Sequence, residues 1–460
     1  MKYDLIIIGG GAAGFAAAET AVRGRAKVCL IEQEQLGGEC PNWACVPTKA
    51  LLASARHYYR AKHELRAFGV RAQTVSFSFR AIMERKDAVV ATITGEGKRL
   101  EKRAEELGIV VVKGSAVFVD AHTVVVGRKK LYGTSIVLAT GTVPFIPPIA
   151  DIEHTPYLTY RDVVSLKRQP RSLVIVGGGP VACEFATFFA MLGTKVTLVE
   201  LRDTILNHED TEIAAIASAQ MRALGVDVHV GAKVLSSKRA GKRVEVTYQV
   251  GSSPRGRILV DAVVLAAGTR PAVDSLALDK AGVKLDSRGR LKSDVYQRTN
   301  VKHIFAAGDV DGGFQFTHMA HVEGSVAGHN AVAKSVRSFK KRDDRVVPRV
   351  TFVYPEVASV GMTVQEANAK KNVCEIASYP VGSLGRSVTD NQRIGLLKCI
   401  VEKKTGRILG AHMIGERAGE VIHELALAMH TGATAKEVAS LIHAFPTYSE
   451  SIGAALASYE

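Results

Sequence analysis

The chain has few of the features that mark membrane or secreted proteins. Its 460 residues include only six cysteines and one tryptophan, and no run of eighteen apolar residues is present to span a membrane. The apolar run near the N-terminus has only four residues and leads into glycines, so we expect a buried strand and not a signal peptide. With 47% hydrophobic and 23% charged residues, we expect a soluble cytoplasmic protein of several domains.

Acidic residues are fewer than basic ones. The chain has 60 Lys and Arg against 45 Asp and Glu, a net charge of +15. Such a balance occurs in proteins that bind nucleic acid or acidic partners. The basic residues are spread along the chain, with small clusters at 337–345 and 403–407, and no nucleic-acid motif accompanies them. We expect solvated basic faces and no nucleic-acid partner, and an acidic protein partner stays open.

Cysteine usage separates one close pair from four single residues. Cys40 and Cys45 are five positions apart, and a close pair in a cytosolic protein is more often catalytic or metal-binding than structural. A zinc site needs two more Cys or His ligands at short spacing, and none lies near Cys40, so we expect no metal site. We expect the other four to be small buried side chains. They are Cys29, Cys183, Cys374 and Cys399.

One internal repeat organises the first half of the chain. The segments 4–14 and 172–186 each predict an apolar strand that runs into a glycine turn and then a helix. Each is followed by a second strand that ends in a glutamate. The glutamate lies 23 residues after the first glycine in both units, from position 9 to 32 and from 177 to 200.

The repeated residues have physical roles in a dinucleotide-binding fold. The first glycine makes the tight turn, the second lets a pyrophosphate approach the backbone, and the third position lets helix and strand pack closely. The helix N-terminus offers amides to the phosphates, and the glutamate accepts hydrogen bonds from a ribose. Two such units with equal spacing predict two Rossmann-like domains. The predicted binding residues are Gly9, Gly11, Gly14 and Glu32 in the first unit and Gly177, Gly179 and Glu200 in the second.

The remaining chain predicts a mixture of helices and strands. Apolar spacing predicts helices over 50–66, over 78–107 and near 417–431, and short strands over 109–138 and 220–272. Gly141 and Gly268 each close a strand-rich stretch, and a later strand ends at Asp309. From residue 346 the pattern changes to strands followed by a helix. The predicted fold class is therefore α/β, with two Rossmann-like domains and a further α+β domain.

The segment 37–49 holds the close cysteine pair and two prolines. Residues five apart on an ideal helix lie too far apart for a disulfide. Pro41 suits a first helical position, which would place Cys40 at the N-cap, and Pro47 removes a backbone hydrogen bond. We expect the distorted turn to bring the two sulfurs together and the helix dipole to lower the thiol pKa. The alternative is a pair of buried, inert cysteines.

Taken with the repeat, this segment resembles the flavoprotein disulfide reductases, which include dihydrolipoamide dehydrogenase, glutathione reductase and mercuric reductase. The resemblance covers essentially the whole chain, and its motifs follow one another in the same order as in the family. It implies FAD in the first Rossmann-like domain, NAD(P) in the second and a homodimer formed through the last domain. The implied domains are 1–148 (FAD, first part), 149–272 (NAD(P)), 273–340 (FAD, second part) and 346–460 (dimerisation).

The resemblance also implies roles for single residues. Cys45 matches the thiol on the flavin side, and Cys40 matches the exchange thiol that meets the substrate. Lys49 matches a lysine near the flavin, and Glu184 matches its ion-pair partner. The other implied cofactor contacts are Thr140 and Gly141 at the turn after the first FAD segment, Asp309 at the FAD ribityl chain and Gly268 at the matching turn of the second unit.

The nicotinamide cofactor is predicted from the residues that follow the second strand of the NAD(P) unit. Glu200 accepts from a ribose 2′-hydroxyl and repels a 2′-phosphate. NADPH-using relatives carry arginines where this chain has Leu201 and Asn207, and Arg202 compensates only in part. We predict NADH, with NADPH as the less favoured alternative. Pro180 departs from the aromatic residue that shields the nicotinamide pocket in some relatives.

The largest departure from the family pattern lies near the C-terminus. Relatives have a His-Pro-Thr-x-x-Glu motif whose histidine is the acid/base for thiol exchange, but here Phe445 precedes Pro446, and Glu450 remains. A positioned acid/base contributes roughly 10²–10⁴ in rate, so its loss should impair dithiol oxidation. His443 matches a separate, non-catalytic histidine. Tyr448 is either a proton donor or, as we expect, a packed interface residue.

We therefore predict an NADH-dependent enzyme that passes electrons through FAD and the Cys40–Cys45 disulfide to or from a thiol or disulfide substrate. One alternative is a reductase of soft electrophiles such as Hg(II) or oxidised sulfur species. Mercuric reductases also lack the histidine, but they use a C-terminal cysteine pair that this chain does not have. Another alternative is a dehydrogenase subunit that docks on an acidic multienzyme complex. A flavoprotein with only a binding role is disfavoured by the intact pair, and no role is assigned to Trp43.

Overall fold

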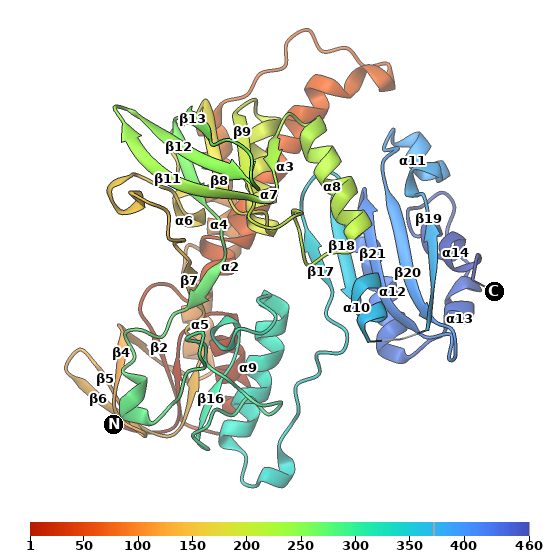
Figure 1. Ribbon diagram of the computed structural model, residues 1–460. Coiled ribbons are helices and arrows are strands. Elements are labelled where there is room, and N and C mark those ends of the chain that lie inside the picture. Colours follow the sequence, from red (N-terminus) through yellow and green to blue (C-terminus); the bar gives the residue numbers. More distant parts are fainter. Residues whose placement is uncertain (371–372, 460) are drawn as a thin grey trace. The chain divides into compact units, whose positions relative to one another are not determined.

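The computed structural model describes residues 1–370 and 373–459 (Figure 1). Glu460, the last residue of the predicted dimerisation domain, lies outside the described residues. The chain forms two compact units. Unit 1 consists of Met1–Ala50, Glu84–Phe145 and Gly268–Asp344, and unit 2 consists of Leu51–Met83, Ile146–Ala267 and Arg345–Glu460. The predicted domain limits stay a prediction.

Unit 1 is built on a seven-stranded sheet of order β3-β2-β1-β6-β5-β4, with β16 also paired to β6. Strands β3, β2, β1, β6 and β16 run parallel, and β4, β5 and β6 are antiparallel. The strands are β1 (Lys2–Ile8), β2 (Val28–Glu32), β3 (Val110–Lys113), β4 (Ala116–Asp120), β5 (Thr123–Val126), β6 (Lys129–Leu138) and β16 (Ile304–Ala306). A separate pair joins β7 (Thr142–Pro144) to β15 (Thr269–Pro271).

The first strand shows why this segment of the chain is uniformly apolar. Leu5 and Ile7 lie in one buried cluster, while Ile6 and Ile8 lie in another. Because β1 is central and both of its faces are covered, it needs apolar residues at successive positions.

Helices α1 (Ala12–Arg23) and α9 (Thr317–Val332) pack together in unit 1 at very short range. A Cβ atom on Gly324 would lie 2.0 Å from the backbone oxygen of Ala13, and one on Gly328 would lie 2.3 Å from that of Ala17. Only glycine fits at these two positions. The helix that follows the first glycine turn is therefore held rigidly beside the sheet.

Unit 2 contains three sheets. A parallel sheet of order β10-β9-β8-β14 and an antiparallel sheet β11-β12-β13 follow from the second repeat, and an antiparallel sheet β17-β18-β21-β20-β19 forms the C-terminal part. The first two sheets contain β8 (Ser172–Val176), β9 (Lys195–Val199), β10 (Asp227–His229), β11 (Ala232–Ala240), β12 (Arg243–Val250), β13 (Gly256–Val260) and β14 (Ala262–Leu265). The third contains β17 (Arg349–Thr351), β18 (Glu356–Gly361), β19 (Cys374–Tyr379), β20 (Leu396–Glu402) and β21 (Ile408–Gly415).

Helices cover these sheets and connect them. The C-terminal helix α12 packs against β18 and β21, and α14 packs against β19 and β20. These two helices are α12 (Ala418–Thr431) and α14 (Glu450–Leu456). The remaining α-helices of the two units are α2 (Glu39–Asn42), α3 (Cys45–His63), α4 (Phe79–Thr94), α5 (Arg99–Glu106), α6 (Tyr160–Val163), α7 (Pro180–Met191), α8 (Thr211–Ala223), α10 (Val364–Ala369), α11 (Gly385–Thr389) and α13 (Ala435–Ala439). Short 3₁₀ turns are η1 (Leu65–Phe68), η2 (Ile152–His154), η3 (Leu278–Ala281), η4 (Asp309–Asp311), η5 (Val336–Ser338) and η6 (Val381–Ser383).

The α/β class and the two strand–turn–helix–strand repeats are confirmed as β1-α1-β2 and β8-α7-β9. The single helix predicted over 78–107 is wrong, because it divides into α4 and α5. Gly95 and Gly97 have φ values of +58° and +82° between the two helices, a conformation that ends a right-handed helix. The prediction of four buried cysteines fails at Cys374, which is half-buried at the start of β19.

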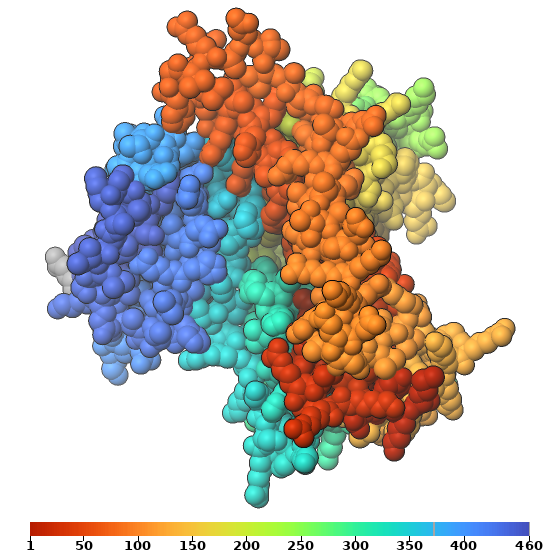
Figure 2. All heavy atoms as spheres, turned by 180° about the vertical axis from the view of Figure 1, so that it is seen from behind, coloured from red at the N-terminus to blue at the C-terminus, as the bar shows by residue number. Residues whose placement is uncertain are grey.

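The segment between α3 and α4 lies at the surface. Most residues of 64–78 are exposed, and Figure 2 shows this segment in orange on the visible face. Within the described part of the chain, no helix combines the length and the apolar character needed to cross a bilayer.

Candidate active site

The glycine turn of unit 1 forms an open cradle beside a fixed carboxylate. A Cβ atom on Gly9 would lie 2.2 Å from the oxygen of Ala139, and one on Gly14 would lie 1.8 Å from the oxygen of Gly9. At Gly11, by contrast, the nearest atom to an added Cβ is 3.9 Å away. Gly9 and Gly14 are therefore required for packing, while Gly11 keeps space open in front of the N-terminus of α1, where a pyrophosphate fits.

The carboxylate of Glu32 is fixed by two backbone amides of unit 1. Gly10 N–H donates to Oε2 and Glu34 N–H donates to Oε1, both at 2.7 Å. The side chain is buried at the end of β2. Its remaining acceptor capacity lies beside the glycine turn, as ribose recognition requires.

The second repeat reproduces this arrangement in unit 2. Gly177 has φ +120°, and an added Cβ would lie 2.3 Å from the oxygen of Ala266. No atom lies within 4 Å of a Cβ added at Gly179. Arg202 N–H donates to Oε1 of Glu200 at 2.7 Å, which holds this carboxylate at the end of β9.

One buried polar atom in unit 1 has no partner within the described protein. The hydroxyl of Thr140 is buried and makes no hydrogen bond. It precedes Gly141, which has φ +66° and whose carbonyl accepts from Ala272 N–H at 3.0 Å. A buried hydroxyl without a partner costs free energy, so a bound group that supplies one stabilises the site. Together with the cradle at Gly11 and the fixed Glu32, this fits a flavin dinucleotide.

Asp309 begins the turn η4 after β16 in a cluster of carboxylates. Burial raises the pKa of Asp309 to about 6, with further contributions from Asp311 and Glu39. Glu323 on α9 is 1% exposed, and burial together with Asp311 raises the pKa of Glu323 to about 7. The carboxylate of Glu323 accepts from Gly308 N–H at 2.7 Å. Glu323 therefore fixes the turn that presents Asp309.

Arg342 is the cation that balances this cluster. It lies in the segment 337–345, one of the two small basic clusters of the sequence. Its guanidinium pairs with Glu323 at 3.4 Å, with Asp311 at 3.8 Å and with Asp344 at 3.0 Å. Sequence reasoning missed Glu323 and Arg342. The only signal available was a single acidic residue in the segment that forms α9 and one arginine among many.

The two cysteines belong to unit 1 and lie on the consecutive helices α2 and α3. Cys40 is the second residue of α2, whose N-cap is Gly38, so the prediction that Cys40 is the N-cap is wrong. Gly38 has φ +63°, a left-handed conformation that glycine accommodates and that starts the helix two residues earlier. Cys45 is the first residue of α3. A thiolate at this position is stabilised by the amides of the first helical turn and by the helix dipole.

The pKa of Cys40 is raised and not lowered, which corrects the expectation from the helix dipole. Its largest causes are a hydrogen bond with the Cys45 thiol and burial, followed by the charge of Cys45; Thr317 and Lys49 act in the opposite direction. The two sulfurs therefore lie close together, as the sequence predicts. The Sγ of Cys45 also lies 3.7 Å from Oγ1 of Thr317, at the N-terminus of α9. A negative charge on Cys40 is therefore opposed when Cys45 is already charged.

Lys49 and Glu184 lie in different units. Lys49 follows Cys45 by one helical turn on α3, and its charge acts on Cys40. Glu184 is buried on α7, and its Oε1 accepts from Phe352 N–H at 3.0 Å. Their ion pair stays a prediction. Trp43 ends α2 between the two cysteines, and its N–H donates to the oxygen of Glu39 at 2.8 Å.

The C-terminal motif forms an ordered loop around Phe445 and Pro446. The Phe445–Pro446 peptide is cis, and Phe445 is 80% exposed. Oε2 of Glu450 accepts from Thr447 N–H at 2.8 Å and so holds the loop. His443, the nearest imidazole in sequence, is paired with Glu424 at 2.9 Å.

The surroundings of Tyr448 are those of a packed structural residue and not of a residue that donates a proton to the substrate. It is buried, and its hydroxyl donates to Oδ2 of Asp390 at 3.1 Å. Arg386 donates to the same oxygen at 2.8 Å. Burial and the neighbouring Asp390 raise the pKa of Tyr448. The phenol is therefore protonated at neutral pH and packs the loop that carries Phe445.

Within residues 1–370 and 373–459, no group of three or more His, Cys, Asp or Glu side chains is arranged to hold a metal ion.

Comparisons with known proteins cover nearly the whole chain. Residues 3–324 match the family model described as pyridine nucleotide-disulphide oxidoreductase, and residues 347–456 match the dimerisation domain of that family. Dihydrolipoyl dehydrogenase of Geobacillus stearothermophilus is 35% identical over 455 residues, covering 98% of this chain and 94% of the relative. Mercuric reductase of Staphylococcus aureus is 31% identical over 458 residues, covering 100% of this chain and 82% of the relative.

A solved structure is similar over its full length. The Cu(II) complex of the HOCl-induced flavoprotein disulfide reductase RclA from Escherichia coli matches with a TM-score of 0.88 and 30% identity, covering 100% of both chains.

Proposed function

The chain belongs to the pyridine nucleotide-disulphide oxidoreductases, and we propose that within this family it uses NADH to reduce a soft electrophile through Cys40 and Cys45. As a member it is a flavin-dependent oxidoreductase that acts on sulfur groups with FAD and NAD(P). The observation that carries the finer proposal is the replacement of the exchange acid/base by an exposed Phe445 beside an otherwise intact motif.

FAD has a fitting site in unit 1. Gly9, Gly11, Gly14 and Glu32 would hold its adenosine and pyrophosphate, and Thr140, Gly141, Lys49 and Asp309 would contact its flavin half. When bound, FAD supplies the two-electron relay between nicotinamide and disulfide. Gly177, Gly179, Glu200 and Gly268 would hold the nicotinamide cofactor.

We propose NADH as the donor because of the position of Glu200. Its carboxylate is held at the end of β9 by Arg202 N–H, next to the open space at Gly179. A fixed negative charge there accepts a ribose 2′-hydroxyl and repels a 2′-phosphate. The ratio of kcat/KM for NADH and NADPH tests this choice directly.

The two thiols have different tasks in the proposed reaction. NADH and one proton reduce the Cys40–Cys45 disulfide to two thiols and leave NAD⁺. The Cys40 sulfur then attacks a disulfide substrate and releases one thiol, and Cys45 attacks the mixed disulfide and releases the second. The stabilised position of Cys45 at the start of α3, and the raised pKa of Cys40, favour Cys45 as the resting thiolate.

The acceptor class follows from what the exchange site lacks. Oxidation of a dithiol needs a base to remove thiol protons, and Phe445 offers none. A thiophilic metal ion needs only thiolates: two Cu(II) ions accept one electron each, or Hg(II) accepts two, as the dithiol returns to the disulfide. The relatives named mercuric reductase and the Cu(II) complex of RclA support this class. An oxidised sulfur compound is the second candidate, favoured by the dihydrolipoyl dehydrogenase relatives.

Acceptor turnover tests the proposal. Steady-state NADH oxidation is measured with Cu(II), Hg(II), glutathione disulfide and lipoamide, in the wild type and in Cys40→Ser. The proposal expects metal-ion turnover that exceeds lipoamide turnover at least tenfold and that the serine variant loses. Faster lipoamide turnover, or metal reduction that survives Cys40→Ser, would overturn it.

We also propose a homodimer formed by the C-terminal part of unit 2. Residues 347–456 match the dimerisation domain, and several large apolar side chains of this part are exposed in the single chain. They are Leu427, Leu441, Ile442 and Phe445. Such a group of side chains is typical of a surface that a partner covers.

A further inference from the structure

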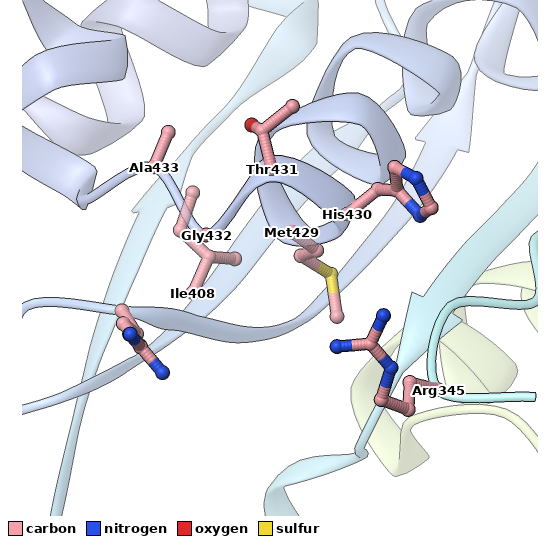
Figure 3. A pocket seen from close by; sticks show the side chains of 8 residues that line it. Arg345, Ile408, Met429, His430, Thr431, Gly432 and Ala433 are labelled. Atoms are coloured by element: carbon pink, nitrogen blue, oxygen red, sulfur yellow. The ribbon is translucent and has the colours of Figure 1, made fainter. Parts of the chain in front are cut away.

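A pocket of about 220 Å³ lies in the C-terminal part of unit 2, at the end of α12. Three basic side chains line it, and none of its lining residues is acidic. Figure 3 shows the Arg345 side chain reaching toward Met429 at the end of that helix. The lining residues are Arg345, Arg407, Ile408, Met429, His430, Thr431, Gly432 and Ala433.

The walls of the pocket are held by backbone hydrogen bonds. Arg407 forms an antiparallel bridge with Thr434, and Ala435 N–H donates to the oxygen of Gly406 at 2.8 Å. Gly432 ends α12 with φ +78°, and Ala433 N–H donates to the oxygen of Ala428 at 2.9 Å. The pocket is therefore formed before any ligand binds.

The charge of the pocket is positive. The carbonyl end of α12 contributes about half a negative charge, and part of it is already satisfied by the glycine cap. The two positive charges of Arg345 and Arg407 exceed this partial negative charge. The carboxylates near the lining residues in sequence have other partners: Asp344 pairs with Arg342 at 3.0 Å, Glu437 accepts from Thr434 at 2.8 Å, and Glu402 accepts from Thr405. Among the described residues, no hydrogen bond or ion pair occupies the Arg407 guanidinium.

We propose that this pocket binds a phosphoryl group, either as inorganic phosphate or on a small phosphorylated metabolite. Its volume lies below the range of about 300–1,000 Å³ typical of drug-sized ligands, so a whole dinucleotide does not fit. The planar donors of two arginines match the oxygens of a tetrahedral anion, and His430 adds a third basic side chain at the rim. None of its lining residues belongs to the glycine cradles, to the cysteine pair or to the loop that carries Phe445, so the proposed role lies outside electron transfer and thiol exchange.

Isothermal titration of the FAD-loaded protein with inorganic phosphate tests the site. The titration is done at constant ionic strength, with NAD⁺ present to occupy the nucleotide cradles. The expected result is one saturable site whose Kd rises at least tenfold in Arg407→Gln and in His430→Gln. Lys404→Gln is the matched control, because Lys404 is exposed on the same turn but does not line the pocket. Its Kd should stay within twofold of the wild type.

Further ligands decide the source and the chemistry. Tighter binding of AMP that competes with phosphate identifies a phosphorylated metabolite, and equal or weaker binding identifies free phosphate. Three results overturn the proposal: no saturable phosphate binding, acetate binding as tight as phosphate, or equal weakening in Lys404→Gln and Arg407→Gln. Each variant is first checked for an unchanged flavin spectrum and Tm, and two independent pocket variants guard against a folding defect in one of them.

Discussion

At the scale of single residues, the two cysteines are unequal although they lie close together. Cys45 begins α3, where backbone amides and the helix dipole stabilise a thiolate. The pKa of Cys40 is raised first by its hydrogen bond with Cys45 and by burial. The asymmetry therefore comes from the helix register of each cysteine, since Cys40 lies within a short helix and not at its N-cap.

This asymmetry predicts the effect of removing one thiol. In Cys45→Ser, the pKa of Cys40 should fall, because the Cys45 sulfur, whose hydrogen bond and charge both raise it, is removed. The pH dependence of Cys40 alkylation by iodoacetamide, in reduced wild type and variant, measures the shift. Cys374→Ser, which changes a half-buried thiol of unit 2, should leave the profile unchanged. A Cys40 profile that stays in place or moves upward in Cys45→Ser would contradict the interpretation.

Phe445 is predicted to limit dithiol oxidation. Phe445→His places an imidazole before the cis proline, where Glu450 already holds the loop. Dihydrolipoamide oxidation should rise at least tenfold, toward the roughly 10²–10⁴ that a positioned acid/base contributes. Steady-state kcat/KM measures the gain, and Phe445→Leu should show none. If Phe445→His also shows no gain, the exchange geometry differs by more than one side chain.

Glu323 is predicted to make the stability of the apoprotein depend on pH. Its folded pKa of about 7 lies above the ordinary value of 4.5, so protons favour the folded state. The contribution is complete below pH 4.5 and is lost as the pH rises through 7, which amounts to about 3 kcal/mol. Asp309, with a pKa of about 6, acts in the same direction.

Denaturant unfolding of the apoprotein between pH 4.5 and pH 7.5 measures this effect. The decline in unfolding free energy with rising pH should be smaller in Glu323→Gln than in the wild type. Glu437→Gln is the control with the opposite effect, because hydrogen bonds from Thr434 lower the pKa of Glu437. The decline in unfolding free energy should therefore be larger in Glu437→Gln than in the wild type. An equal decline in wild type and Glu323→Gln would show that Glu323 does not titrate in this range.

At the scale of elements, the strand–glycine–helix units were predictable because their signals are local. A central strand buried on both faces needs a continuous apolar run, and the tight turn needs glycine at fixed positions. The roles of Glu323 and Arg342 were not predictable, because their partners lie on distant segments. Local rules also misplaced the start of α2, where a left-handed Gly38 and not Pro41 determines the register.

The glycine turn of unit 2 predicts two separable effects. Gly179→Ala should leave the Tm within about 2 °C of the wild type, because no atom lies within 4 Å of the added Cβ. It should raise the KM for NADH at least tenfold, because the methyl group fills the space needed by the pyrophosphate. Gly177→Ala should instead lower the Tm, since its Cβ would lie 2.3 Å from Ala266 O. Thermal unfolding and initial-rate kinetics separate the two, and an unchanged KM in Gly179→Ala would place the pyrophosphate elsewhere.

At the scale of the whole molecule, the described structure gives more detail on electron entry than on electron delivery. The cradles, Glu32, Thr140 and the cysteine pair are specified by contacts within the single chain. The acceptor side is specified only by Phe445 and the loop that holds it. The net charge of +15 still permits an acidic partner, and location in the cytoplasm stays a prediction from sequence.

The central claim is that NADH reduces the Cys40–Cys45 disulfide, and mass spectrometry after alkylation tests it most directly. The air-oxidised FAD-loaded protein is alkylated under denaturing conditions before and after one equivalent of NADH without oxygen. The account predicts a disulfide-linked, unalkylated pair before NADH and one alkyl group on each of Cys40 and Cys45 afterwards. An alkylation state of these two cysteines that does not change with NADH would contradict it.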